Sequence, residues 1–394
     1  MGKPKIRFKG YTDEWEQRKL NTITDVRDGT HDSPKYVEVG HPFITSKNVK
    51  DGYINYDDVQ YVSDEDFEEI NKRSKVDIND ILMGMIGTVG NIALVRETPN
   101  FAIKNVALIK DTEEVFYLYL YHCLQSNSIV SQLSENLDGG TQKFIALNKI
   151  RNLNIPLPNK NEQYRVGNFL EILDNLITLH QRKYEQAKTL KKYMLQKMFP
   201  QDGMRVPEIR FAGFTDEWEQ RKFSDCAQRE SLFQTSSYDC PSVEYEDVIA
   251  EEGCLNKDIR LKEVQKTGIK FDGTQVLYGK LRPYLHNWLN PDFMGVAVGD
   301  WWVFRPVEID KNFLYRLIQT KKFDNVANQS SGSKMPRADW NLVSQSEFIV
   351  PISLEEQCRI AEAFEELDRL ITLHQRKCDE LRKIKKYMLQ NMFC

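Results

Sequence analysis

The chain has 394 residues, of which 41% are hydrophobic and 28% are charged, a composition typical of globular protein and not of fibrous or membrane-embedded chains. A chain of this length usually forms more than one domain, since single cores stop growing near roughly 250–300 residues. The formal net charge of −4 gives no overall positive surface, so binding of nucleic acid would depend on local groups of basic residues.

The cysteines and the amino-terminal segment favour a cytoplasmic protein. Seven cysteines are scattered from Cys123 to Cys394 without a Cys-x-x-Cys pair, which disfavours a disulfide framework or a zinc ribbon. The opening residues, MGKPKIRFKG, contain no apolar segment for secretion. The uncharged run at 81–95 contains three glycines and is shorter than the ~18 residues of a membrane helix. We therefore expect no membrane contact.

Two segments of the sequence are repeated almost unchanged. An opening segment, PKIRFKGYTDEWEQRKL at residues 4–20, returns as PEIRFAGFTDEWEQRKF at residues 207–223. A closing segment, LDNLITLHQRK from Leu173, returns as LDRLITLHQRK from Leu367. The inserts between them are similar in length but differ in sequence. The chain therefore predicts two related halves with a constant frame and variable inserts.

Both inserts are expected to combine strands and helices. The first contains runs such as YVEVGHPFITSKNVKDGYI, ILMGMIGTVGNIALV and FAIKNVALIK, in which β-branched and aromatic residues are interrupted by turn-forming residues. Residues 115–133 predict an amphipathic helix, and residues 311–329 predict its counterpart in the second half. Each insert should form a twisted sheet with helices at one side.

Each closing segment predicts one long helix, the first at about residues 161–199. Such a helix would be roughly 55 Å long at ~1.5 Å per residue, so much of its apolar stripe should pack against the other copy. An antiparallel pair would place the inserts at opposite ends, whereas a parallel pair would bring them together. The expected pairing residues are Leu173, Leu176, His180, Leu190 and Met194 in the first helix, and Leu367, Leu370, His374, Ile384 and Met388 in the second.

The predicted fold class is α+β, with two mixed α/β domains related by an internal repeat and joined by two long helices that pair as a coiled coil, in an antiparallel or a parallel arrangement. The expected segments are a first domain at 1–158, a first helix at 159–200, a second domain at 201–352 and a second helix at 353–394.

Known catalytic motifs are missing. The Gly-Lys pair in YGKLRP, residues 278–283, is followed by Leu and not by the Ser or Thr of a phosphate-binding loop. The tetrad NPDF at 290–293 has Asp where amino-methyltransferases have a second Pro, and no Glu is followed two places later by Lys, as in common metal-dependent nucleases. We expect no catalytic residue, metal or cofactor in this chain.

Three histidines could suggest other chemistry. His31 lies between Asp28 and Asp32 and could serve acid–base catalysis or bind a metal, but a turn fixed by Asp, Gly and Ser is the favoured interpretation. His180 and His374 occupy equivalent helix positions. They could bind a metal, but polar residues that fix the register of a helix pair are favoured.

Polar segments in both inserts have the residue types that contact base edges, namely Arg and Lys for guanine and Asn and Gln for adenine. Each segment alone also fits a solvated loop, but both inserts offer two. Some of these residues should contact phosphates, which position a protein without specifying sequence. The candidate DNA-binding residues are Lys47, Asn48, Gln142 and Lys143 in the first insert, and Lys280, Arg282, Tyr284, Ser333, Lys334 and Arg337 in the second.

Over essentially its whole length the chain resembles the specificity (S) subunit of type I restriction-modification enzymes. The resemblance is carried by the repeated opening and closing segments and by DGTHDSPKY, ILMGMIGTVGN, GGTQKFIALNKIRNLNIPLP, YGKLRPYL and VPISLEEQ. It implies two target-recognition domains, each of which reads one half of a bipartite double-stranded DNA site. It also implies that the two long helices pair as an antiparallel coiled coil, set the spacing of the half-sites and dock two methyltransferase (modification) subunits.

The same resemblance implies that this chain is not an enzyme. S-adenosylmethionine, ATP and Mg are then expected on the partner modification and restriction subunits, the latter an ATP-dependent endonuclease. Two rival functions remain open. One is a scaffold that holds two ligand-binding modules and never touches DNA, which the net charge favours. The other is a self-contained modification enzyme, which would need a methyl-donor pocket.

Overall fold

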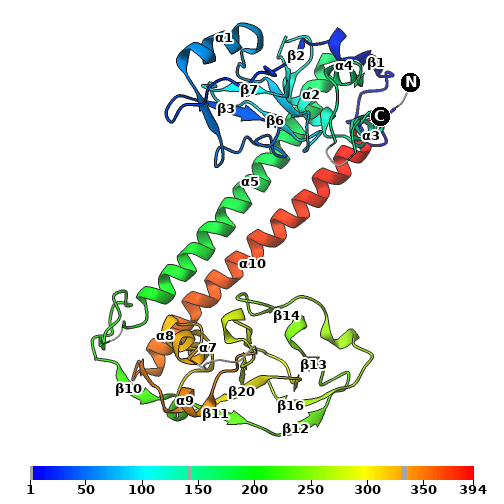
Figure 1. Cartoon of the computed structure of the whole chain (residues 1–394). Coiled ribbons are helices and arrows are strands. Elements are labelled where there is room, and N and C mark those ends of the chain that lie inside the picture. Colours follow the sequence, from blue (N-terminus) through cyan, green and yellow to red (C-terminus); the bar gives the residue numbers. More distant parts are fainter. Residues whose placement is uncertain (1–2, 141–142, 202, 330–334) are drawn as a thin grey trace. The chain divides into compact units, whose positions relative to one another are not determined.

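The computed structural model describes residues 3–140, 143–201, 203–329 and 335–394 and divides the chain into two compact units. Unit 1 consists of Met1–Gln181 and Arg376–Cys394, and unit 2 consists of Arg182–Gln375. Each unit therefore contains one insert and a part of each long helix, α5 (Lys160–Lys197) and α10 (Leu354–Asn391), which are drawn in green and orange-red in Figure 1.

Both units contain a pair of antiparallel helical segments. In unit 1, Arg382 Nη2 donates to Gln181 Oε1 at 2.9 Å, and Lys385 Nζ lies 2.6 Å from Asp174 Oδ1. The residue numbers thus rise along α10 as they fall along α5. The predicted α+β class with antiparallel long helices is confirmed.

One ion pair of this helix pairing is made twice. In unit 1 Lys385 binds Asp174, and in unit 2 Lys191 Nζ lies 2.7 Å from Asp368 Oδ1. Lys191 and Lys385 occupy the same place in the repeated closing segment, as do Asp174 and Asp368. All four side chains are at most 30% exposed, so solvent screens these pairs less than fully exposed ones. The repeat therefore encodes the helix pairing itself.

The same four-stranded antiparallel sheet lies at the centre of each unit. Its two inner strands are apolar on both faces, because alternate residues face two different hydrophobic clusters. The strand orders are β2-β8-β5-β6 and β11-β20-β17-β18. In unit 1 the strands are β2 (Val26–Asp28), β8 (Val106–Ile109), β5 (Ile81–Gly84) and β6 (Ile92–Leu94), and in unit 2 they are β11 (Ala227–Glu230), β20 (Trp301–Pro306), β17 (Val276–Gly279) and β18 (Trp288–Leu289).

A second sheet differs between the units. Both versions contain a parallel pair of strands, β3–β7 in unit 1 and β13–β19 in unit 2. Unit 1 adds β4 beside β3, whereas unit 2 adds β16 and β12 beside β19. The strands are β4 (Gln60–Val62), β3 (His41–Thr45), β7 (Ala102–Lys104), β12 (Phe233–Thr235), β16 (Thr267–Phe271), β19 (Gly295–Ala297) and β13 (Ser242–Val243).

The helix predicted at 115–133 is two helices, and so is its counterpart at 311–329. Unit 1 has α2 (Tyr117–Leu124) and α3 (Asn127–Glu135), and unit 2 has α7 (Lys311–Leu317) and α8 (Lys321–Ala327). Thr320 has an extended backbone, and its hydroxyl accepts a hydrogen bond from Phe323 N. Ser126, also extended, precedes α3. These hydroxyl residues are favoured at helix starts, and they interrupt an otherwise continuous apolar pattern.

The opening segment of each half pairs with the strand that precedes the long helix. β1 (Glu16–Lys19) pairs antiparallel with β9 (Asn154–Leu157), and β10 (Glu219–Lys222) pairs in the same way with β21 (Glu347–Val350). In unit 1, Arg7 binds Glu162 through Nε at 2.6 Å and Nη2 at 2.8 Å. The buried Trp15 donates its Nε1–H to the same carboxylate at 3.2 Å.

Unit 2 repeats this arrangement at the start of α10. Arg210 binds Glu356 through Nε at 2.7 Å and Nη2 at 2.9 Å, and Trp218 Nε1 donates to Glu356 Oε1 at 3.1 Å. Glu356 is 2% exposed, and Glu162 is fully buried. A buried carboxylate is tolerated only when its lone pairs are satisfied. The repeated Arg and Trp of the opening segment therefore serve to pair the buried glutamate of the helix.

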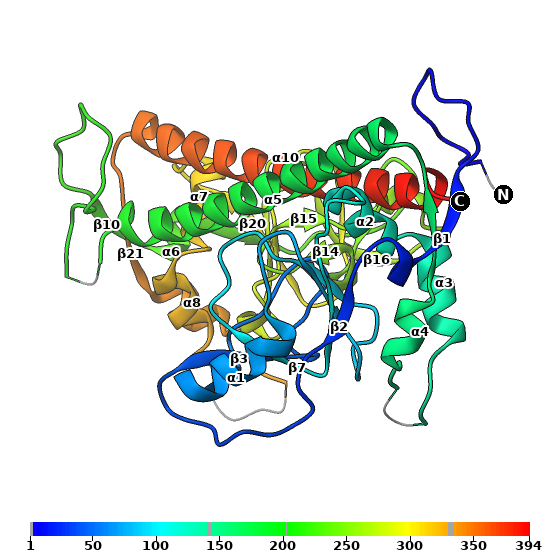
Figure 2. The same cartoon turned by 90° about the horizontal axis from the view of Figure 1, so that it is seen from above.

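The carboxyl-terminal ends of α5 and α10 also make equivalent contacts. Ile209 N donates to Lys197 O at 2.9 Å, and Ile6 N donates to Asn391 O at 2.9 Å. The first opening segment thus contacts the end of α10 in the same way as the second opening segment contacts the end of α5. In Figures 1 and 2 the carboxyl-terminal end of α10 lies beside β1, near α3.

The ten predicted pairing residues differ in burial, and their role in pairing stays a prediction. Leu173 is buried, and Met194, Leu367 and Met388 pack against the cores, while His180 and His374 are half-buried. Leu176, Leu190, Leu370 and Ile384 instead remain 36 to 47% exposed. Residues two apart on a helix point to nearly opposite sides, and Leu176, Leu370 and Ile384 each lie two positions from Asp174, Asp368 or Arg382.

The remaining helices and strands are short. They are α1 (Asp64–Ser74), α4 (Leu147–Arg151), α6 (Phe223–Cys226), α9 (Trp340–Gln345), β14 (Val248–Ile249), β15 (Cys254–Leu255) and the 3₁₀ turns Leu20–Thr22, Tyr245–Asp247, Ile259–Leu261 and Pro283–Leu285. Among the residues that the structure describes, no helix is both long and apolar enough to cross a membrane.

Removal of the buried carboxylate should destabilise one unit at a time. Glu162→Ala leaves the nearly buried Arg7 without its partner, which typically costs about 3–5 kcal/mol, and it should lower the stability of unit 1 alone. Glu356→Ala should do the same to unit 2. Hydrogen exchange of peptides from each unit, measured in increasing urea, resolves the two effects. Glu69→Ala, which breaks an exposed pair with Lys72, is the control and should change little.

Candidate nucleic-acid interface

In unit 2 two separate segments meet beyond the end of β17. Leu281 forms a β-bridge with Arg337, Arg282 N donates to Pro336 O at 2.7 Å, and Ala338 N donates to Lys280 O at 2.8 Å. We call residues 280–286 and 335–338 the unit 2 tip. Four predicted DNA-binding residues, Lys280, Arg282, Tyr284 and Arg337, lie in it, so the structure brings these residues of two candidate segments together.

An acidic residue organises the cations of the unit 2 tip. Asp300 Oδ2 accepts from Arg337 Nη2 at 3.0 Å and Nε at 3.2 Å, and Lys280 Nζ lies 3.5 Å from Asp300 Oδ1. The hydrogen bond from Arg337 is the main reason why the pKa of Asp300 is lowered. Arg337 nevertheless remains 51% exposed. The guanidinium is therefore fixed in orientation but accessible from solvent.

Tyr245 holds the backbone of the unit 2 tip in place. Its hydroxyl accepts a hydrogen bond from Leu281 N at 3.1 Å and donates to Asp300 O at 2.6 Å. The ring stacks on Trp301 with 4.7 Å between the centroids. Burial raises the pKa of Tyr245 well above its usual range, so the hydroxyl stays protonated. No sequence motif marks this residue, because a lone Tyr in a turn gives no signal.

Arg282 and Tyr284 are the most exposed predicted residues of this tip. Arg282 adopts a left-handed backbone conformation with φ 48°, which is uncommon outside glycine and occurs often at functional sites. Its side chain is exposed, and Tyr284 is 52% exposed. Both can therefore meet a ligand without rearrangement of the fold.

Unit 1 has the same construction at the equivalent place. Gly87 N donates to Lys143 O and Ile145 N donates to Met85 O, both at 2.9 Å, and Ile86 forms a β-bridge with Phe144. We call residues 85–90 and 143–145 the unit 1 tip. The unit 1 tip follows β5 and the unit 2 tip follows β17, which are equivalent inner strands of the two central sheets. The two tips therefore occupy matching positions.

A short side chain does in unit 1 what Tyr245 does in unit 2. Ser46 Oγ accepts from Met85 N at 2.9 Å and from Ile86 N at 3.2 Å, and it donates to Asn105 O. Tyr245 likewise joins the backbone after β17 to that before β20. The backbone of both tips is thus fixed by a hydroxyl group, while the side chains that project from them differ.

The chemistry of the two tips is different. The unit 1 tip presents Ile86, Val89 and Phe144, the last of which is 43% exposed. Asn105 lies where unit 2 has Asp300, and its Oδ1 is 2.7 Å from His31 Nδ1. The other ring nitrogen of His31 is 2.9 Å from Asp28. Unit 1 thus has a mostly apolar tip where unit 2 has a cationic one.

The remaining predicted residues have mixed outcomes. Asn48 is 3% exposed, and its amide bonds Thr45, Asn55 and Asp58, so it shapes its loop and is not accessible to DNA. Lys47 is 58% exposed and pairs with Asp58 at 2.9 Å, and Lys143 is exposed beside Phe144. Gln142, Ser333 and Lys334 lie outside the described residues.

One group of side chains in unit 1 could in principle hold a metal. His122, Glu171 and Asp174 bring one potential ligand atom each within 4.8 Å of the others. However, His122 faces Glu171 with Nε2 at 3.9 Å and Asp174 with Nδ1 at 4.0 Å, so the two carboxylates face different ring nitrogens. Arg96 already pairs with Glu171, and Lys385 with Asp174. We therefore interpret the group as a charge-balanced contact of the helix pair.

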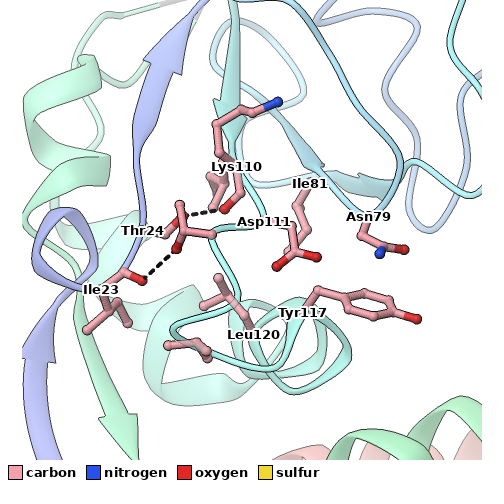
Figure 3. A pocket seen from close by; sticks show the side chains of 11 residues that line it. Ile23, Thr24, Asn79, Ile81, Lys110, Asp111, Tyr117 and Leu120 are labelled. Atoms are coloured by element: carbon pink, nitrogen blue, oxygen red, sulfur yellow. Dashed lines mark hydrogen bonds between the residues drawn. The ribbon is translucent and has the colours of Figure 1, made fainter.

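Two hollows of the structure suit DNA less well than the tips do. Figure 3 shows a cavity of about 10 Å³ in unit 1, where Thr24 Oγ1 donates to Lys110 O; it has room for about one water. In unit 2 a hollow of about 760 Å³ beside α5 is lined by both cations and carboxylates, among them Lys188, Lys192, Glu185 and Glu252. Such mixed charge does not suit a phosphate backbone.

Comparison with known proteins identifies the family. Residues 12–189 and 289–383 match the family described as the type I restriction modification DNA specificity domain. These ranges include most of the chain, and the chain therefore belongs to this family.

Individual relatives agree. The specificity subunit of the type I restriction enzyme MjaVIII from Methanocaldococcus jannaschii is 24% identical over 382 residues, which are 90% of this chain and 88% of that protein. The putative MjaX specificity subunit of the same organism is 28% identical over 197 residues, so that the chain spans about half the length of that relative, 46%. The crystal structure of the type I S subunit from M. genitalium has the same fold, with 15% identity, a TM-score of 0.69 and coverage of 100% and 99%.

His122 should make the stability of unit 1 depend on pH. Burial, together with Lys385 and Arg96 nearby, lowers the pKa of His122 well below its usual range. Below about pH 6.5 the unfolded ring takes up a proton that the folded ring does not. The free energy of unfolding therefore decreases as the pH is lowered, by up to about 1.4 kcal/mol per pH unit.

The variant His122→Gln, which lacks the titrating group, tests this. In urea unfolding of unit 1 at pH 7.5, 6.5 and 5.5, the free energy of unfolding of the variant should decrease less than that of the wild type as the pH is lowered. Parallel pH dependences of the two proteins would contradict the expectation. The raised pKa of Asp174 acts in the opposite direction in both proteins.

Proposed function

We propose that this chain is the DNA-reading, non-catalytic subunit of a type I restriction-modification complex. Each unit reads one half of a bipartite site in double-stranded DNA, and the two long helices set the spacing of the halves and dock two methyltransferase subunits. Methyl transfer with S-adenosylmethionine and ATP- and Mg-dependent cleavage then belong to the partner modification and restriction subunits. Its place of action is the cytoplasm, where bacterial and archaeal DNA lies.

One observation carries this proposal: the two units share the backbone arrangement of their tips but carry different side chains there. Ser46 and Tyr245 fix equivalent backbone positions, whereas Phe144 stands where the other unit has Arg337. A protein that reads two different short sequences needs this combination of a constant frame and variable contacts, because sequence is read by side chains at base edges. A scaffold that only joins two modules has no need for it.

The docking surface we propose is an exposed apolar stripe on the long helices. Leu179 is 44% exposed, Leu190 47% and Tyr193 46%, and on the second helix Leu373 is 49%, Ile384 42% and Tyr387 55% exposed. Apolar residues that a helix keeps in solvent at helical spacing favour a protein partner. The equivalent residues of the repeat carry the stripe on both helices, which supports two copies of one partner.

The helix length supports the role as a spacer. Each long helix has 38 residues, and 38 residues at ~1.5 Å per residue extend about 57 Å. Two half-sites one helical turn of DNA apart are separated by roughly 34 Å along the duplex axis. Helices of this length are therefore long enough to serve two half-sites on one DNA duplex.

A charge on the apolar stripe should prevent assembly without unfolding the chain. Leu179→Asp together with Leu373→Asp adds carboxylates to two exposed positions, so the units should stay folded while co-purification of the methyltransferase subunit is lost. Thr178→Asp is the matched control, since the adjacent residue is exposed on another side of α5. Undiminished co-purification of the double variant would refute this docking surface.

The function itself is tested by the sites that the complex methylates. The chain is co-expressed with the methyltransferase encoded beside it, and methylated adenines are mapped across the host genome. We expect a single motif with two defined parts and a spacer of fixed length. A stable complex that methylates no such motif would contradict the proposal and favour the scaffold.

A further inference from the structure

Arg337 and Asp300 form a pair whose geometry suits one base in particular. Asp300 occupies Nε and one hydrogen of Nη2 of the guanidinium. Among the residues that the structure describes, no partner is found for Nη1 or for the outer hydrogen of Nη2. These two groups form the planar outer edge of the guanidinium, which carries parallel N–H donors.

Such an edge matches guanine. In the major groove guanine presents two acceptors, O6 and N7, side by side, and a bidentate arginine is the most common contact to them. Adenine offers one acceptor and one donor there, and cytosine and thymine offer no such pair. Because the other edge of the guanidinium is already bound to a carboxylate, the side chain is held in place before DNA arrives. Less side-chain entropy is therefore lost on binding.

We infer that Arg337 reads a guanine in the half-site bound by unit 2, with Asp300 as the residue that positions its guanidinium. The inference rests on the proposed function and adds the identity of one base to it. Lys280, which shares Asp300, and the exposed Arg282 lie in the same tip and add positive charge for the DNA backbone.

The matching position in unit 1 supports an asymmetry between the half-sites. Phe144 stands at the place of Arg337, and Asn105 at the place of Asp300. Phenylalanine cannot donate to guanine, and together with Ile86 and Val89 it offers an apolar surface suited to a thymine methyl group. Unit 1 therefore has no equivalent guanine contact at this position.

An ion pair between two loop segments could also be purely structural. In that case loss of Arg337 would weaken unit 2 and reduce methylation of all sequences alike. A base contact instead predicts loss of discrimination at one position only, because other bases no longer leave a fixed donor edge unpaired. Base preference is thus the readout that separates the two roles.

The test uses the complex of the whole chain with its methyltransferase subunit, without restriction subunits. Genomic methylation is mapped for the wild type and for Arg337→Ala, Arg337→Lys and Asp300→Asn. In Arg337→Ala the preference for guanine at one position of one half-site should fall from roughly 10- to 100-fold to near none, while the other half-site is unchanged. Arg337→Lys should retain part of the preference, and Asp300→Asn should weaken it at the same position with an unchanged melting temperature.

Matched variants control for charge and for the other unit. Arg260→Ala removes another exposed cation of unit 2 and should leave every base preference intact. Phe144→Ala should alter only the half-site that Arg337→Ala does not affect.

The outcomes separate this inference from the function on which it rests. The guanine contact would be overturned if Arg337→Ala left the two-part motif unchanged, or if it weakened methylation without a change of base preference at any position. Either result would leave the function standing. The same holds if the base whose preference is lost in Arg337→Ala is not a guanine. Absence of any methylated motif in the wild-type complex would overturn both.

Discussion

The architecture depends on one buried carboxylate at the start of each long helix. Glu162 and Glu356 are almost completely removed from water, and an unpaired charge there would cost several kcal/mol, on the order of the whole stability of a domain. Its partners, an arginine and a tryptophan, come from the opening segment of the same half, far away in the sequence. The start of the helix, the opening segment and the strand between them are therefore fixed as one body.

This constraint separates the parts of the chain that must stay constant from those that are free to change. The helix start receives a second set of hydrogen bonds from the neighbouring glutamine, since Gln163 binds Phe116 N and Pro158 O and Gln357 binds Asp310 N and Pro351 O. The tips, by contrast, are held mainly through backbone atoms. Their exposed side chains contribute little to the fold, and new ones can be accommodated without loss of the frame.

Much of the fold could be predicted from sequence, because the repeated letters encode the constant contacts. The long helices and the mixed character of the inserts followed from repetition and periodicity, whereas the antiparallel orientation of the helices followed from the resemblance to a known family. The exposed faces of Leu176 and Leu370 could not be predicted, since an apolar stripe does not reveal which of its residues meet the paired helix and which await another partner. Ser126 and Thr320 show a further limit, because a single capping residue within an apolar run is a weak signal.

The candidate site was harder to predict for a related reason. Lys280 and Arg337 are far apart in the sequence and meet through backbone hydrogen bonds between their segments and through Asp300, which no motif indicates. Asn48 has the right chemistry for a base contact, but its amide is consumed by the loop that it shapes. Residue type alone does not distinguish a side chain that contacts a ligand from one that builds the surface on which the ligand lies.

The contact of Ile6 with Asn391, which repeats that of Ile209 with Lys197, has a topological consequence. The chain is equivalent to a ring of two segments that is covalently closed at one junction and open at the other, although both junctions pack alike. The order in which the segments are encoded is thus not dictated by packing. Genetic rearrangement could move the opening of the ring from one junction to the other, or join segments from different genes, while the same side chains would still meet.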